Sequence, residues 1–314
     1  AHQRHFLERE FGKNRADRLQ PVMQEAYRLA YIRKPEFMGN TRTEEKDPKF
    51  KVISDLPWCE QGKSNERLAA YRQLSDKVEQ EWHALPAQKK ETYFQLVKYP
   101  VQAAAQMNNK LLTAQLARHG KADWADSDRA YDSIVSLTKT YNTTKWNRMM
   151  DFQPRRLLVF NRVERKALSS GLLEKPQAVY TWNGADCVEG ASVICEGLGY
   201  EGKAVAVEKK KELTFEFAAW ETDSVEVEVR LLPNHPVEGE RLRFTISLDG
   251  SATEAVSYET KGRSEEWKEN VLCNQAVRRM ILPVARKASH RLIFTALDEG
   301  VVLDQICLYM PRIK

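Results

Sequence analysis

The chain has 314 residues, of which 42% are hydrophobic and 30% are charged, and its formal net charge is +5. This length suits two domains of ordinary size, and the composition is sufficient to bury a hydrophobic core. No apolar run approaches the roughly 20 residues that cross a bilayer, so we expect no membrane-spanning helix. Residues 1–175 carry 32 basic and 22 acidic side chains. Because the two signs are interspersed and stacking aromatics are not interleaved with them, we expect solvated helix faces and no nucleic-acid binding.

Residues 1–175 show hydrophobic side chains at spacings of three and four residues, which predicts amphipathic α-helices. The first helix, with its apolar stripe at residues 19–31, has Asn14 as a candidate N-cap. The third is expected to run from Pro86 to Gly120, with a kink at Pro100. Apolar stripes of this kind occupy four stretches, at residues 19–31, 68–85, 94–112 and 134–141. Four long helices, the last three joined by short turns, predict an antiparallel helical bundle.

Two segments of this helical half lack clear periodicity: a loop at residues 36–63 and a connector at residues 142–175. A structureless loop as long as the first is uncommon inside a compact domain. Such a loop is either functional and packed on a neighbour, or a plain excursion over the surface. The sequence leaves both interpretations open.

Residues 176–314 change to a period of two, which is typical of β-strands. SVEVEVRLL alternates at Val225, Val227 and Val229, and RLRFTISLDGS alternates before it ends in a D-G turn signal. Seven or more short strands without an intervening helical pattern predict an antiparallel β-sandwich. We therefore predict an α-then-β chain, with a helical bundle at residues 1–175 and a β-sandwich at residues 176–314.

The cysteines are five and scattered, and none forms a C-x-x-C pair, so we expect neither a zinc site nor a thioredoxin-type centre. A disulfide bridge between Cys187 and Cys195 is possible, but buried free thiols are the favoured interpretation. The five are Cys59, Cys187, Cys195, Cys273 and Cys307.

No local motif for catalysis is present: there is no G-x-S-x-G, H-E-x-x-H, P-loop or dinucleotide fingerprint. Four aspartates between Asp123 and Asp132 could supply the two carboxylates of a glycosidase, but clustered acids at a helix N-terminus are explained by the helix dipole. We predict no catalytic residue, no metal site and no cofactor in this chain.

The stretch YPVQAAAQMNNKLL places amides and a cation on a helix that otherwise forms core. Buried amides are costly unless they are hydrogen-bonded, so at least one of these groups should bind a backbone, a partner segment or a ligand. Amides that tie the helices together are the favoured interpretation. Asn108 and Lys110 remain candidates for contact with a partner or a ligand.

Four segments together give the chain a resemblance to a known family. They are RKPEFMG, YFQLVKYPVQAAAQMNNKLLTAQLAR, RAYDSIVSLTKTYNTTKWNRMMDFQPR and EEWKENVLCNQA. In this order they resemble the C-terminal part of glycoside hydrolase family 115, the xylan α-glucuronidases. The resemblance implies a large enzyme with a (β/α)8 catalytic barrel before the helical bundle and a β-sandwich after it. It also implies removal of α-1,2-linked glucuronic acid, or its 4-O-methyl form, from glucuronoxylan.

Residues 1–314 contain no eight-fold alternation of strands and helices. We therefore expect a C-terminal fragment that supports the barrel and the substrate groove, and that is inactive alone. The resemblance further implies three partners or settings: the N-terminal (β/α)8 domain of the same protein, a homodimer when the protein is intact, and a periplasmic or secreted location.

YNTTKWNRMMDFQPR mixes large apolar, amide, guanidinium and carboxylate groups, which is unusual for a plain connector. With the barrel implied by the resemblance, we interpret this segment as a surface that packs against it. Direct contact between Arg148 and the carboxylate of the substrate is a further possibility, since arginine binds carboxylates with two parallel hydrogen bonds. The candidates for barrel docking or the substrate groove are Asn108, Lys110, Trp146, Asn147, Arg148, Met149 and Asp151, with Met150 as added apolar contact.

Two other functions are compatible with the sequence. One is a free-standing carbohydrate-binding or adhesion module, for which the sandwich offers four ring candidates: Trp182, Trp220, Tyr258 and Trp267. The other is a helical scaffold that binds anionic partners through its basic half, with strong dependence on salt.

Overall fold

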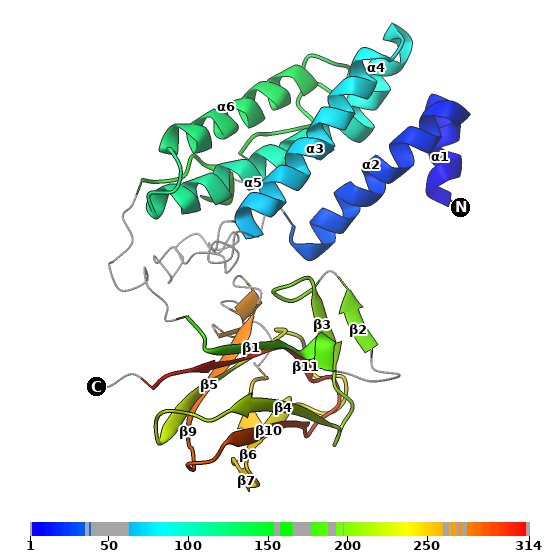
Figure 1. Ribbon diagram of the computed structural model, residues 1–314. Helices are drawn as coiled ribbons and strands as arrows, with labels where there is room; N and C mark the ends of the chain where they lie inside the picture. The colour runs from blue at the N-terminus through cyan, green and yellow to red at the C-terminus, as the bar shows by residue number, and fades with distance from the viewer. Residues whose placement is uncertain are drawn as a thin grey trace. The chain divides into compact units, whose positions relative to one another are not determined.

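A computed structural model describes residues 2–34, 38, 63–153, 158–165, 177–187, 193–196, 198–259, 264, 266–267, 270–271 and 275–311. The chain divides into two compact units, Ala1–Leu173 and Glu174–Lys314. The first is helical and the second consists of β-strands (Figure 1), which confirms the predicted α-then-β fold class. The loop predicted at residues 36–63 and much of the connector predicted at residues 142–175 lie outside the described residues. Among the helices of the described ranges, none is long and apolar enough to cross a membrane.

The helical unit is a series of neighbours in which α1 packs on α2, α2 on α3, α3 on α5 and α5 on α6 (Figure 1). Apolar side chains at helical spacing form its main core, among them Leu7, Leu19, Val22, Leu74, Val78, Tyr93 and Val97. The elements are α1 (His2–Phe11), α2 (Lys13–Ile32), α3 (Lys63–His83), α4 (Ala87–Tyr93), a π-helical turn (Phe94–Lys98), α5 (Tyr99–Arg118), α6 (Trp124–Tyr141) and a 3₁₀ turn (Leu158–Phe160).

Two details of the predicted helices are wrong. The N-cap of α2 is Gly12, whose φ of 86° lies in the region that favours glycine, and the predicted cap Asn14 lies inside the helix. The predicted third helix is interrupted by the π-helical turn, in which the Tyr99 amide donates to the Phe94 carbonyl five residues earlier. Pro100 follows in the first turn of α5. Because proline collides with the carbonyl four residues before it in a regular helix, a wider turn directly before Pro100 relieves that clash.

The β unit consists of two antiparallel sheets that share one core. One sheet has the order β2-β3-β11-β5-β9, with β1 also paired to β11; the other has the order β4-β10-β6-β7, with β8 also paired to β6. The strands are β1 (Tyr180–Asn183), β2 (Val193–Glu196), β3 (Lys203–Ala206), β4 (Glu212–Ala218), β5 (Ser224–Leu231), β6 (Arg243–Leu248), β7 (Ser251–Ala252), β8 (Val256–Ser257), β9 (Ala276–Pro283), β10 (Ser289–Ala296) and β11 (Val302–Tyr309).

The alternation predicted in β6 appears as alternating burial, and in β5 the predicted valines are buried. In β6, Phe244, Ile246 and Leu248 face the core, and the Phe244 ring stacks on Phe294 of β10 at 5.1 Å between ring centres. The D-G turn follows β6, with φ of 52° at Asp249 and 90° at Gly250. Strand β11 is the centre of its sheet, and all eight of its residues are buried.

The polar side of β5 departs from the simple alternating pattern. Glu228 and Arg230 are buried, and their side chains bond each other at 2.7 Å. Arg279 on β9 donates to the second oxygen of Glu228, and Arg230 donates to Gln305 on β11. Burial raises the pKa of the Glu228 carboxyl, but Arg230 and Arg279 outweigh it and hold that pKa below its usual range. The charges are therefore paired, as buried ions must be.

Three cysteines, Cys187, Cys195 and Cys307, are free thiols. Cys187 and Cys195 therefore do not form the disulfide bridge that the sequence left possible. Cys59 and Cys273 lie outside the described residues.

Candidate functional site

The C-terminus of α6 leads into a compact series of turns, residues 141–153, which we call the connector turn. Backbone hydrogen bonds fold it back on itself: Asn147 donates to Thr144 and Met149 donates to Trp146. The Asn142 side chain donates to the Met150 carbonyl at 3.0 Å and closes the fold. The connector turn is thus ordered by its own contacts.

The connector turn presents methionines to solvent. Met149 is 66% exposed and Met150 is 39% exposed. Trp146, in the same segment, is half-buried and packs against a cluster formed by Phe94, Tyr99 and Tyr141. Two flexible apolar side chains at the surface form an adaptable contact surface.

Two polar atoms beneath this surface lack hydrogen-bond partners. The indole Nε1 of Trp146 and the Oδ1 of Asn142 are both shielded from solvent and unpaired within the described residues. A buried polar group without a partner costs about 1–3 kcal/mol. Both atoms lie in the same short segment as the exposed methionines.

The polar candidates of the connector turn are exposed. Asn147, Arg148 and Asp151 all face solvent, and Arg148 has a φ of 66°, which is uncommon for a residue with a side chain. Asp151 accepts a hydrogen bond from the Gln153 amide at 3.0 Å. Within the described residues, the side chains of Asn147 and Arg148 make no hydrogen bond or ion pair, so both remain available.

Lys110 is placed differently from these surface candidates. Its side chain is buried, and Nζ donates to the carbonyls of Val159 and Asn161 at 2.7 and 2.8 Å. The Tyr131 ring lies 5.9 Å from the ammonium group. Burial lowers the pKa of Lys110 to about 7. Lys110 therefore fastens the returning connector to α5, and its donors are used inside the helical unit.

Ion pairs fasten the same returning segment to α6. Arg162 bonds Asp132 at 2.6 Å and Asp128 at 2.9 Å, and Arg165 bonds Asp128 at 2.6 Å. Hydrogen bonds from Arg162 and Arg165 lower the pKa of the Asp128 carboxyl. Asp123 accepts from the Ala125 amide as the N-cap of α6. These aspartates thus have structural partners.

Asn108 is also fully buried. It accepts from Arg67 at 2.7 Å and donates to the Ala104 carbonyl at 2.8 Å. Arg67, on α3, donates in addition to the carbonyls of Leu29 and Arg33, at the C-terminus of α2. Asn108 thus joins α5 to α3. This agrees with the favoured interpretation that the amides on this helix tie the helices together. Sequence reasoning missed Arg67, whose only signal is a cation among the apolar positions of α3.

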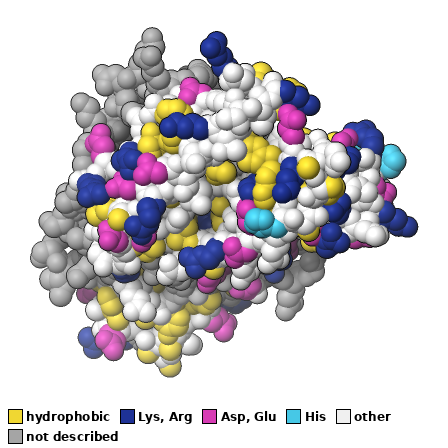
Figure 2. Space-filling model, turned by 90° about the horizontal axis from the view of Figure 1, so that it is seen from above, with side chains coloured by type: hydrophobic (Ala, Val, Ile, Leu, Met, Phe, Trp, Pro, Cys, Tyr) yellow, Lys and Arg dark blue, Asp and Glu magenta, His cyan; other side chains and the backbone are white. Residues whose placement is uncertain are grey.

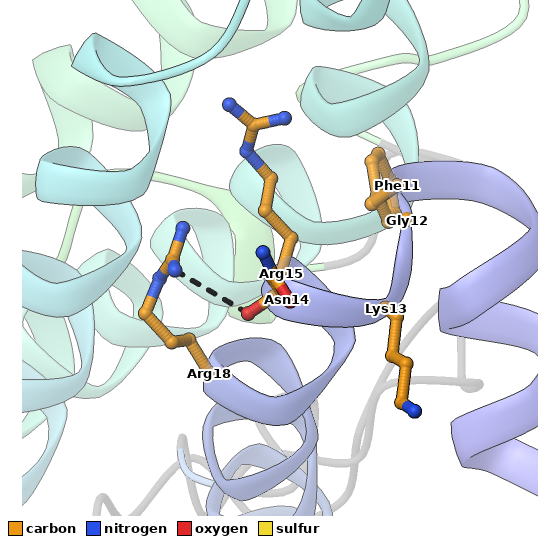
Figure 3. A pocket seen from close by; sticks show the side chains of 6 residues that line it. All are labelled: Phe11, Gly12, Lys13, Asn14, Arg15 and Arg18. Carbon is orange, nitrogen blue, oxygen red and sulfur yellow. Dashed lines mark hydrogen bonds between the residues drawn. The ribbon is translucent and has the colours of Figure 1, made fainter.

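A hollow of about 480 Å³ lies at the junction of α1 and α2 and is the other candidate site (Figure 3). Two of its three basic side chains have printed partners, and the third is Lys13. Arg18 donates to the Asn14 carbonyl and to Glu81, and Arg15 donates to the Ala84 carbonyl. These groups hold α2 against α3, so the hollow is a product of helix packing.

The surface view agrees with interspersed charge. In Figure 2, basic and acidic side chains lie close to one another with hydrophobic patches between them, and no single basic surface forms on this face. Among the described residues, no group of three or more His, Cys, Asp or Glu side chains is arranged to hold a metal ion.

Comparison with known proteins gives the family. Residues 191–314 match the model of the glycosyl hydrolase family 115 C-terminal domain. A solved family GH115 4-O-methyl-α-glucuronidase, BtGH115A, with specificity for decorated arabinogalactans, is 59% identical and has a TM-score of 0.81; the match covers 99% of this chain and 41% of that one. The chain belongs to glycoside hydrolase family 115. This family 115 chain therefore spans less than half the length of that enzyme.

Other solved structures match the sandwich of the family 115 chain only distantly. A family 35 carbohydrate-binding module from Clostridium thermocellum is 12% identical, with 42% of this chain and 98% of that one covered and a TM-score of 0.33. A module of the Cellvibrio mixtus lichenase 5A, in complex with cellotriose, is 12% identical over 43% and 100%, also with a TM-score of 0.33. Likeness at this level carries no argument about function. No curated protein matches the chain.

The four rings proposed for sugar binding do not share an exposed face in the family 115 chain. Trp220 and Tyr258 are buried in the core of the sandwich. Trp182 packs against the same core and stacks on Tyr180, while Trp267 is half-buried and stacks on His235 at 5.4 Å. A row of planar rings open to a polysaccharide is therefore not formed by these four residues.

Proposed function

We propose that the chain is the C-terminal, non-barrel part of an α-glucuronidase that releases glucuronic acid, or its 4-O-methyl form, from a plant polysaccharide. The observation that carries the proposal is the 59% identity to a 4-O-methyl-α-glucuronidase over 99% of this chain. Hydrolysis of a glycosidic bond usually needs two carboxyl groups across a small gap. We expect these groups in a (β/α)8 domain of the same protein.

The proposed role of the helical unit is to hold that catalytic domain. Support comes from the connector turn, where Met149 and Met150 are exposed and polar atoms of Trp146 and Asn142 are unpaired within the described residues. Arg148 adds an unpaired guanidinium group, which suits a carboxylate either on the catalytic domain or on the substrate. Asn108 and Lys110 act one layer deeper, since they fix the helices and the connector on which this surface is built.

Two polysaccharides are candidates for the substrate. Glucuronoxylan, with α-1,2-linked glucuronic acid on xylose, follows from the family resemblance. Decorated arabinogalactan is favoured by the specificity of BtGH115A, the 59% identical relative. We propose that the group removed is a uronic acid in either case. We also propose that the intact protein is a homodimer.

The test is hydrolysis by the whole protein, with uronic acid release measured by chromatography. One substrate is an aldouronic acid from glucuronoxylan, and the other is a glucuronic-acid-capped oligosaccharide from arabinogalactan. Release from at least one is expected, and the preferred one identifies the substrate. Binding to either substrate without release would instead support the carbohydrate-binding alternative. If the protein neither bound nor hydrolysed either substrate, both the glucuronidase proposal and the carbohydrate-binding alternative would be overturned.

Residues 1–314 alone are expected to release no uronic acid, because we propose that the catalytic carboxyl groups lie in the (β/α)8 domain. Docking is tested in the whole protein by Met149→Asp with Met150→Asp, which places charge on the contact surface. We expect activity to fall at least tenfold, while Lys139→Asp, an exposed change on α6, leaves activity within twofold. Equal activity in both variants would contradict docking through the connector turn.

A further inference from the structure

The buried carboxyl group of Asp304, on β11, is not explained by the proposed function. Asp304 is 0% exposed. It is the extra residue of a β-bulge, because the pairing of β11 with β5 shifts register between Leu303 and Gln305. Leu303 and Ile306 belong to the core of the sandwich, so the bulge leaves both Asp304 and Gln305 on the other side of the sheet. There the carboxyl group meets residues 198–202, which lead from β2 to β3 and which we call the β2–β3 turn.

Asp304 holds the β2–β3 turn against its sheet. The pairing of β3 with β11 ends at Leu303, and Asp304 follows it directly. Both Asp304 oxygens lie 3.0 Å from the amide nitrogen of Tyr200, and a Cβ on Gly199 would lie 2.5 Å from Oδ1. Tyr200 is 4% exposed, and the centre of its ring lies 5.4 Å from Cζ of Arg230. The turn is therefore closely packed, and moving it off β11 uncovers Tyr200.

The site offers few hydrogen-bond donors to an ionised carboxylate. A carboxylate has about four acceptor positions, but the Tyr200 amide supplies one shared hydrogen and the Gln275 side chain lies 3.4 Å away. Asp304 forms no ion pair within the described residues. Glu228, a second buried carboxyl group in the same sheet, is by contrast hydrogen-bonded by two arginines. Because a buried charge without such partners is costly, the Asp304 site suits the neutral acid better than the carboxylate.

The charged groups near Asp304 do not offset its burial. In the described part of the chain, two of them act on its carboxyl group: Arg230 on β5 and Glu201 in the β2–β3 turn. Arg230 lowers the pKa of Asp304, but its guanidinium group is already bonded to Glu228 and Gln305, and Glu201 raises that pKa. Burial has the largest effect, and the pKa of Asp304 rises from 3.8 to about 6.

We propose that Asp304 makes the contact between the β2–β3 turn and β11 depend on pH: the neutral acid holds the turn on the strand, and ionisation of the carboxyl group loosens it. When the turn opens, Asp304 meets water and its pKa returns towards 3.8. Between this value and about 6, the closed form binds more protons than the open form, so a rise in pH favours opening. The contact is therefore tightest below about pH 4 and has lost this contribution above about pH 7.

The test is amide hydrogen exchange in the whole protein, measured by mass spectrometry on a peptide that spans the β2–β3 turn and corrected for the intrinsic effect of pH. In wild type, exchange from the turn should increase about tenfold from pH 5 to pH 7.5, the factor that the two pKa values imply. Asp304→Asn keeps an oxygen for the Tyr200 amide but cannot ionise, so its exchange should not change over this range. Asp223→Asn, the same replacement at an exposed position of the β unit, is the matched control and should keep the wild-type response.

Glu201→Gln is a second variant, at an exposed position of the turn where the core is undisturbed. It removes a negative charge that raises the pKa of Asp304, so the increase in exchange should occur at lower pH. Wild-type exchange from the turn that does not vary with pH would overturn the proposal, as would a pH response that survives Asp304→Asn. If Asp304→Asn does not fold, the wild-type profile and Glu201→Gln still decide, because a response that stays in place or moves to higher pH in Glu201→Gln also overturns it.

Discussion

Lys110 is an unusual residue for the interior of a helical unit, because its ammonium group meets two carbonyl oxygens and no carboxylate among the described residues. Burial lowers the pKa of this group to about 7, against 10.5 for an ordinary lysine. Between these two values the unfolded chain binds more protons at this position than the folded chain. The free energy of unfolding must therefore rise with pH across this window.

The first prediction concerns that slope. From pH 7 to pH 9, the unprotonated form of Lys110 becomes dominant in the folded chain, so wild type should gain stability relative to Lys110→Met by about 1 kcal/mol per pH unit. Urea unfolding followed by helical circular dichroism at several pH values measures the difference. Lys139→Met, on the exposed surface of α6, is the matched control for replacing a lysine by methionine. A wild-type-to-Lys110→Met difference independent of pH would mean that the lysine keeps an ordinary pKa.

Trp146 allows a prediction about the connector turn. Its ring is half-buried against the cluster of Phe94, Tyr99 and Tyr141, and its indole nitrogen lacks a partner within the described residues. Trp146→Ala should therefore cost about 1–2 kcal/mol of unfolding free energy, below the roughly 3–5 kcal/mol of a fully buried tryptophan. Tyr141→Ala, in the same cluster but buried, should cost more. Thermal unfolding of both variants ranks them, and the reverse order would show that Trp146 is the cluster's main support.

At the scale of elements, two glycines before β3 provide a matched pair. Gly199 and Gly202 have φ of 84° and 80°, so alanine is strained at both. A Cβ on Gly199 would lie 2.5 Å from Oδ1 of Asp304, whereas a Cβ on Gly202 would meet open space. Asp304 is buried and accepts from the Tyr200 amide, so it has little room to move.

We predict that Gly202→Ala costs about 1–2 kcal/mol from backbone strain alone. Gly199→Ala should cost about 1–3 kcal/mol more, because it adds a steric clash in a packed region. The midpoint of urea unfolding, followed by a signal of the β unit, compares the two. Equal costs would mean that Asp304 moves freely and that the close approach is unimportant.

The elements of the sandwich are predictable from sequence on one face only. The alternation at Val225, Val227 and Val229 predicts β5, because those side chains fill the core. The intervening residues have the pattern of a solvated face, yet Glu228 and Arg230 are buried. Their partners on β9 and β11 lie 51 and 75 residues further along the chain. Local periodicity contains no information about contacts at that separation.

The candidate site, too, was predictable from sequence only in part. A mixture of apolar and polar groups after α6 indicates a surface segment, and Met149 and Met150 are indeed exposed. The setting of Lys110 was not predictable, since its acceptors Val159 and Asn161 lie 49 and 51 residues away. The π-helical turn was missed because a single extra residue in a helix leaves an almost unchanged apolar pattern. Whether the connector turn meets a catalytic domain stays a prediction.

At the scale of the whole molecule, separate cores predict separate folding. The helical unit and the β unit each have their own hydrophobic cluster, composed of residues of that unit alone. Residues 1–173 and residues 174–314, produced separately, should each unfold cooperatively, with helical and β-type circular dichroism respectively. The midpoint of each should lie within about 5 °C of the corresponding transition in the full chain, a shift of about 1 kcal/mol. A fragment that folds only when the other is added would contradict this.

The position of strand β11 in its sheet also affects the order in which the chain can fold during synthesis. It pairs with β1, β3 and β5, and all three precede it in the chain, so the central strand of that sheet is the last of these four to leave the ribosome. Until then, β1 and β5 lack the strand that joins them, and their unpaired edges are open to other chains. The helical unit does not depend on a late strand in this way, because α5 and α6 are neighbours in sequence and in space. During synthesis, the first half can finish folding while the second still depends on residues not yet made.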